Sequence, residues 1–186
     1  MSITLPEDEP AVIAQILHCL YHEKLEKGCD DGVPADWDKM ATLEKAEIRW
    51  LYLKCYTTAD KICLENMSNA LVDWFITDFA SGAVYWMLSI DTLIQAIRLE
   101  DSLIKLLTVS LAWAIRTMGW DGLKDKTYKG LDDDFARYPQ VAHVLAKALV
   151  SPDYDKETCP CLKYPRCHWH VHQSTPICGV NPALRA

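Results

Sequence analysis

The amino-acid sequence predicts an all-α protein, and three observations lead to that prediction. The chain has 186 residues, of which 50% are apolar and only 7 are glycine, so its length suits one domain with a sizeable core. Apolar residues recur three and four positions apart through most of residues 10–150, the spacing of helices with one buried face. Alternation with period two, which is typical of a half-buried strand, is confined to residues 168–172.

The first helix is expected to begin at Pro10 and to end before Gly28. Proline suits a first helical position, and the acidic residues 7–9 before it favour a helix N-terminus. Its apolar face would be formed by Val12, Ile13, Ile16, Leu17, Leu20 and Tyr21. Residues 29–40 contain glycine, proline and several acidic residues, and they are predicted to form a loop.

Further helices are predicted from about Thr42, from about Glu65, over 89–98 and over 101–117. The buried stripes of the first two would consist of Ile48, Leu51, Tyr52, Cys55 and Ala59, and of Met67, Ala70, Leu71, Trp74 and Phe75. A turn is expected at residues 118–122, which contain two glycines, followed by a final helix over 132–150 that bends near Pro139.

The character of the sequence changes near residue 150. Residues 151–155, Ser-Pro-Asp-Tyr-Asp, interrupt the helical pattern, and four of the eight cysteines follow them. We therefore expect a helical unit over residues 1–150 and a small, irregular tail rich in cysteine and histidine over residues 151–186.

The compartment decides how the cysteines are interpreted. The first ten residues do not read as a signal peptide, and no apolar run reaches the roughly 18 residues that cross a bilayer. An intracellular protein, cytoplasmic, nuclear or both, with mostly reduced thiols is the expectation. The net charge of −7 disfavours a nucleic-acid platform, and the basic residues of the tail are sparse (Lys156, Lys163, Arg166 and Arg185).

The tail is predicted to bind a structural zinc ion. Zinc prefers thiolate and imidazole ligands in tetrahedral sets, and the expected ligands are Cys167, His170, His172 and Cys178. The alternates are Cys159, Cys161 and His168. Two other interpretations stay open. The histidines of residues 168–172 could form the solvated face of a strand, and two tail cysteines could form a disulfide in an oxidising compartment.

A catalytic role for the metal is the alternative to a structural one. A small metal-dependent hydrolase would use His168, His170 and His172, but no acidic residue follows Glu157 and no His-Glu-x-x-His motif occurs. The chain also lacks the glycine-rich nucleotide motifs and the nucleophile-elbow motif. Cys19, Cys55 and Cys63 lie in helical patterns and are expected to be small buried side chains, whereas Cys29 lies in the acidic loop. The prediction is a protein without enzymatic activity.

Three segments together resemble the BTB/POZ domains of filamentous fungi. Residues 5–12 (Leu-Pro-Glu-Asp-Glu-Pro-Ala-Val) and 16–21 (Ile-Leu-His-Cys-Leu-Tyr) resemble the middle helix of such a domain. Residues 56–70 (Tyr-Thr-Thr-Ala-Asp-Lys-Ile-Cys-Leu-Glu-Asn-Met-Ser-Asn-Ala) resemble the next helix pair, although Thr57 and Thr58 replace an apolar residue. Residues 167–178 resemble the Cys-x-x-His-x-His…Cys ending of those proteins.

The resemblance implies the C-terminal helical part of a BTB/POZ domain, its helical extension and the tail. The strand–helix–strand half, which supplies the sheet and much of the dimer interface in that family, is expected to be missing. The implied function is a protein–protein interaction module, with a regulatory or adaptor role. The partners are then other proteins or a second copy, bound through the helices of residues 8–25 and 42–62.

Overall fold

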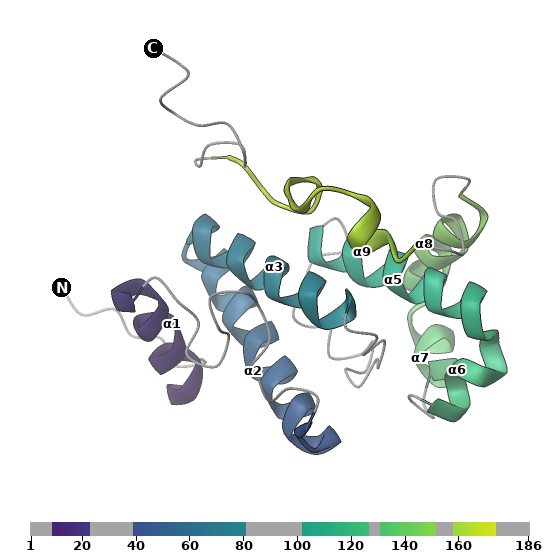
Figure 1. Cartoon of the computed structure of the whole chain (residues 1–186), viewed down its shortest axis with the longest axis horizontal. Coiled ribbons are helices and arrows are strands. Elements are labelled where there is room, and N and C mark those ends of the chain that lie inside the picture. The colour runs from purple at the N-terminus through teal and green to yellow at the C-terminus, as the bar shows by residue number, and fades with distance from the viewer. Residues whose placement is uncertain (1–8, 23–38, 81–101, 127–130, 152–157, 174–186) are drawn as a thin grey trace, which may run out of the picture.

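The structure, a computed structural model, describes residues 9–22, 39–80, 102–126, 131–151 and 158–173 (Figure 1). Within these ranges it contains helices and no strand, so the predicted all-α fold is confirmed for this part of the chain. The helices are α1 (Pro10–His22), α2 (Thr42–Lys61), α3 (Glu65–Ala80), α5 (Ser102–Met118), α6 (Trp120–Lys126), α7 (Leu131–Arg137), α8 (Pro139–Val150) and α9 (Pro160–Lys163), with a 3-10 turn η2 (Arg166–His168). The predicted helix over 89–98 lies outside the described residues.

The helices α1, α2 and α3 pack side by side, with α2 in the middle (Figure 1). Their shared core contains the ring of Trp74 between Tyr52 and Phe75, with ring centroids 4.6 and 5.2 Å apart and edge-to-face geometry. All three rings are at most 1% exposed, so this cluster excludes water from the interface of α2 with α3.

A buried ion pair crosses the same interface. The Arg49 guanidinium donates two hydrogen bonds to the Asp78 carboxylate, from Nε to Oδ2 over 2.7 Å and from Nη2 to Oδ1 over 2.8 Å. The side chains are 3% and 0% exposed. Because both charges have left water, their mutual attraction helps to offset the loss of hydration of each.

The second half of the bundle is built on α5, which contacts α3, α6 and α8. Two predictions are corrected here. The expected turn at residues 118–122 shrinks to Gly119, whose φ of 76° ends α5, and α6 begins at the next residue. The expected bent helix over 132–150 is two helices, because Pro139 lacks an amide donor and starts α8 afresh.

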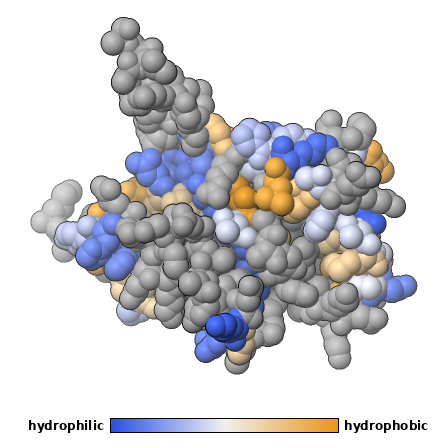
Figure 2. Space-filling model, in the orientation of Figure 1, coloured by the Kyte–Doolittle hydropathy of each residue, from blue (hydrophilic) through white to orange (hydrophobic). Residues whose placement is uncertain are grey.

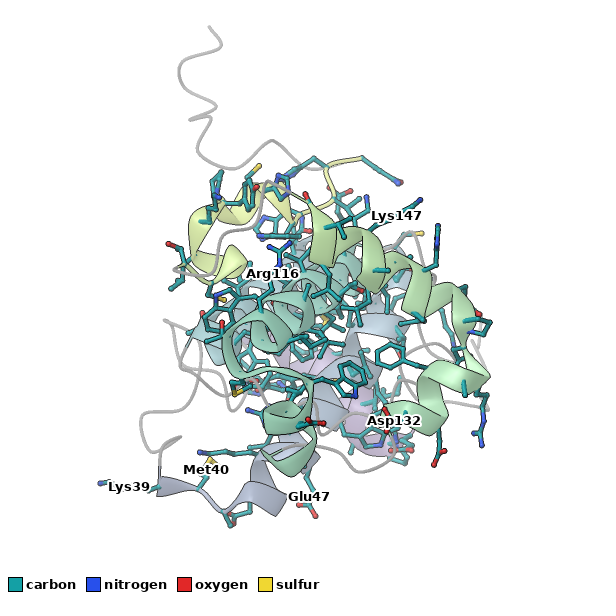
Figure 3. All side chains as sticks on the ribbon, turned by 90° about the vertical axis from the view of Figure 1, so that its right-hand side faces the viewer. Lys39, Met40, Glu47, Arg116, Asp132 and Lys147 are labelled. Atoms are coloured by element: carbon teal, nitrogen blue, oxygen red, sulfur yellow. The ribbon has the colours of Figure 1, made fainter. Side chains whose placement is uncertain are left out.

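Arg116 of α5 holds the end of α8. Its guanidinium donates to the carbonyl oxygens of Ala148, Leu149 and Ser151, the first and last over 3.2 and 3.1 Å. The last carbonyls of a helix lack intrahelical donors. The Ala148 carbonyl also accepts the Ser151 amide over 3.3 Å, and the arginine adds a side-chain donor to all three carbonyls, so it caps α8 where the chain leaves it (Figure 3).

The residues beyond α8 join the core of the helical bundle. In Figure 1 the α9 segment lies across α3 and α5, and it contacts both helices. Cys159 is 7% exposed and Trp169 is 2% exposed, both as members of the main hydrophobic core. The tail therefore packs on both α3 and α5 and adds side chains to their core.

The surface contains small apolar patches. On the face in Figure 2, hydrophobic residues lie in separate patches among hydrophilic ones. In the described ranges, no helix combines the length and the apolar composition needed to span a membrane.

Candidate functional site

The α3 helix holds the tail through two polar side chains one turn apart. The Asn69 amide donates from Nδ2 to the Val171 carbonyl over 2.8 Å and accepts from the Val171 amide at Oδ1 over 3.0 Å. Asp73 Oδ1 lies 3.1 Å from His170 Nε2. Because residues i and i+4 share one face of a helix, the two side chains fix consecutive tail residues.

A thiol and an imidazole meet on the same segment. Cys167 Sγ lies 3.1 Å from His172 Nε2, and the cysteine is a free thiol that is partly buried. The rings of His170 and His172 are 5.8 Å apart between centroids. The η2 turn makes this approach possible, because it reverses the chain between Cys167 and the following histidines.

The interpretation of residues 168–172 as a strand with a solvated histidine face is not supported. His168 is exposed and stacks on Tyr164 at a centroid distance of 4.6 Å, whereas the His170 side chain is 5% exposed and pairs with Asp73. The alternation fails because η2 and the contacts to α3, rather than a pleated strand, set the side-chain directions.

The structure brings together some of the predicted zinc ligands. It places Cys167 beside His172 and His170 beside Asp73, but among the described residues no group of three or more His, Cys, Asp or Glu side chains is arranged to hold a metal ion. Cys178 and the Cys161 side chain lie outside what the structure describes.

Cys159 departs from the expectation of reduced tail thiols. It is disulfide-bonded, so the alternate ligand Cys159 offers no thiolate in this structure and that expectation is wrong for it. Spacing along the chain cannot reveal this, because disulfide formation depends on which sulfur atoms converge in space. Cys19, Cys55, Cys63 and Cys167 are free.

The spacing of one observed pair is close to that of two zinc ligands. From zinc–sulfur and zinc–nitrogen bond lengths, two tetrahedral ligand atoms are about 3.5 Å apart, so the 3.1 Å between Cys167 Sγ and His172 Nε2 needs only a small opening. If His170 Nε2 carries the proton donated to Asp73, the metal-binding lone pair resides on Nδ1. A carboxylate behind a ligating histidine is the usual second layer of such sites.

Sequence reasoning missed both Asn69 and Asp73. Their only signal is that two polar residues four positions apart interrupt the apolar pattern of α3. Such residues usually face water, and nothing local indicates that a segment about a hundred positions later covers them.

The cysteines that precede the tail differ from one another in exposure. Cys55 is buried as predicted, but Cys63 is exposed and follows α2 with a φ of 58°, so its predicted burial is wrong. It lies beyond the last turn of α2, where the chain reverses toward α3. Burial, with a smaller contribution from the nearby Cys19 thiolate, raises the pKa of the Cys55 thiol to about 12.

Iodoacetamide at mildly alkaline pH should modify Cys63 rapidly and Cys55 only after unfolding, because the thiolate is the nucleophile. Since the pKa of Cys55 in the folded protein exceeds the ordinary thiol value of 9.0, the neutral thiol's contribution to stability is present below pH 9 and is lost as pH rises toward 12. Peptide mass spectrometry after timed labelling checks the order. Equal labelling rates for the two native cysteines would contradict the burial of Cys55.

Comparisons of the chain with family models, with curated proteins and with solved structures find no match.

Proposed function

We propose that this chain is an intracellular, non-enzymatic protein–protein interaction module of BTB/POZ type, with a regulatory or adaptor role. The observation that carries the proposal is an apolar stripe on the outer face of α1. Leu17, Leu20 and Tyr21 are 47%, 53% and 82% exposed, and their spacing puts them on one face of the helix. Exposed apolar side chains that cluster in this way are typical of an interaction surface.

The buried side chains next to this stripe hold α1 in place. Val12 and Ile16 are 2% and 3% exposed and anchor the helix on α2, and Glu9 forms an ion pair with Lys54. A helix held in this way can present its outer side chains without a large loss of conformational freedom on binding. The proposed partner is a second copy or another protein, bound through the helices of residues 8–25 and 42–62.

A charge placed on the stripe should weaken self-association. Leu20→Lys is expected to shift the dimerisation constant toward monomer by about tenfold or more, because a desolvated centre tolerates charge poorly. Size-exclusion chromatography with light scattering over a concentration series measures the shift. Val150→Lys is the matched control, since Val150 is 81% exposed on α8. A chain that stays monomeric at every concentration would refute self-association, and equal effects of the two variants would refute the stripe.

We further propose that the tail carries a structural zinc ion bound by Cys167, His170, His172 and Cys178. The approach of Cys167 to His172 and the support of His170 by Asp73 favour this set. Such a metal would fix the shape of the tail, and the contact of His170 with Asp73 would hold the tail on α3. The helices of residues 8–25 and 42–62 would remain available as the binding surface.

The zinc proposal predicts a metal-dependent melting temperature. Protein purified without chelator should contain stoichiometric zinc, and its removal should lower the melting temperature by several degrees, because metal binding contributes folding free energy. Cys167→Ser should lose the metal, whereas Cys63→Ser, which changes an exposed thiol outside the tail, should retain it.

Two outcomes would contradict a structural zinc. If protein from which zinc has been removed melts at the same temperature as the protein before removal, the structural role is wrong. Zinc that can be removed without loss of fold, together with a hydrolytic activity that disappears with it, would favour the metal-dependent hydrolase that uses His168, His170 and His172.

A further inference from the structure

A pocket lies where the tail meets the second half of the bundle. It is a cavity of about 290 Å³ between α5, α8 and the tail residues His168 and Trp169. Its inner wall is apolar, because Val109, Ala148 and Trp169 are 5%, 7% and 2% exposed. The tail thus forms one wall of a pocket on the surface of the second half-bundle that opens to solvent.

The polar groups of this pocket are all neutral or basic. Lys105 of α5 and Lys147 of α8 lie at its rim, together with His168, and no acidic side chain lines it. In the described part of the chain neither lysine has a carboxylate partner. The protein as a whole has a net charge of −7, whereas the side chains that line this pocket carry a local positive charge.

The pocket wall also contains a buried donor. Trp169 Nε1 is inaccessible to solvent and has no hydrogen-bond acceptor among the described residues. A buried N–H without an acceptor lowers stability, and structures usually supply one from water or from a ligand. An acceptor in the pocket reaches this N–H only after a small shift of the indole ring, because the nitrogen is closed to solvent in this structure.

We propose that this pocket binds a small organic carboxylate with a compact apolar group. The carboxylate accepts hydrogen bonds from Lys105 and Lys147 at the rim, and from the Trp169 indole N–H once the ring shifts toward the pocket. The apolar group, about the size of one aromatic ring with a short chain, packs on Val109 and Ala148. An inorganic anion would leave the apolar wall uncovered, and a neutral molecule would leave the two ammonium groups without a counter-charge.

The test uses the full chain and three carboxylates: phenylacetate, 3-phenylpropionate and 4-methylvalerate. Ligand-observed NMR and calorimetry should detect saturable one-site binding of at least one of them. The neutral 3-phenylpropanol and the small anion acetate should each bind about tenfold more weakly, because each lacks one half of the interaction. The failure of all three carboxylates to bind at millimolar concentration would overturn the proposal, and so would equal binding of the alcohol.

Variants locate the site. Lys147→Met, at an exposed position, should weaken binding about tenfold without a change in melting temperature. Lys39→Met removes the same charge at the far end of the molecule (Figure 3) and should leave the affinity unchanged. Trp169→Phe keeps an aromatic ring but removes the N–H, and should weaken binding severalfold. Equal weakening by Lys39→Met would show a general charge effect and would refute this site.

Discussion

Asp78→Asn should destabilise the protein by about 3–5 kcal/mol, the largest loss expected of any single polar substitution in the described core. The asparagine keeps the shape of the aspartate but removes the negative charge that Asp78 places against the Arg49 guanidinium, which is 3% exposed between α2 and α3. The charge cannot return to water unless the interface that also holds Trp74 opens. Urea denaturation followed by circular dichroism measures the change.

Glu9→Gln is the matched control for Asp78→Asn. It breaks the ion pair of Glu9 with Lys54, whose side chains are 58% and 25% exposed, so a loss below about 1 kcal/mol is expected. The double variant Arg49→Met, Asp78→Leu should recover most of the stability, because well-packed apolar residues can replace a buried ion pair. If Asp78→Asn costs no more than Glu9→Gln, the Arg49 charge is solvated and this account is wrong.

Asn69→Ala should release the tail, with a loss of roughly 2–4 kcal/mol from two hydrogen bonds to partly buried main-chain groups. Without the Asn69 amide, the N–H and C=O of Val171 lose partners at 3.0 and 2.8 Å. The His170 contact with Asp73 depends on the same register and should weaken with it. Trp169, two residues before Val171, would then become accessible to solvent.

Hydrogen–deuterium exchange measures the release of the tail directly. The Val171 amide should exchange slowly in the parent protein and rapidly in Asn69→Ala, with faster exchange across residues 158–173. Asn66→Ala alters an exposed asparagine on the same helix and should leave this exchange unchanged. Unaltered protection of the tail in Asn69→Ala would mean that other contacts hold it.

The sequence predicted where helices start better than how the chain reverses between them. Thr42 and Glu65 begin α2 and α3 as expected, because helical periodicity reports the buried face over several turns. Cys63 and residues 118–122 were predicted less well. A chain reversal depends on one or two backbone angles, and the average pattern contains little information about them.

The candidate site was only partly predictable. The ligand types and the pair Cys167 and His172 followed from composition and spacing, since both lie in one short segment. The Asp73 carboxylate and the Asn69 amide come from α3, and the lysines that flank the pocket come from α5 and α8. Contacts between distant segments depend on how the helices pack, which local patterns do not specify.

The sequence by itself thus determined the helical class, most of the buried stripes of α2 and α3, and the concentration of cysteine and histidine in the tail. It did not determine burial residue by residue, because Ala70 of the predicted stripe is exposed, as are Leu17, Leu20 and Tyr21 of the apolar face of α1. Tertiary structure alone decided that the tail lies on α3 and α5, that His170 is buried beside Asp73, and that Cys159 is disulfide-bonded. The physical reason is the range of the interactions. Periodicity and propensity act within a few turns, whereas the tail is held by groups that meet only after the whole bundle has formed.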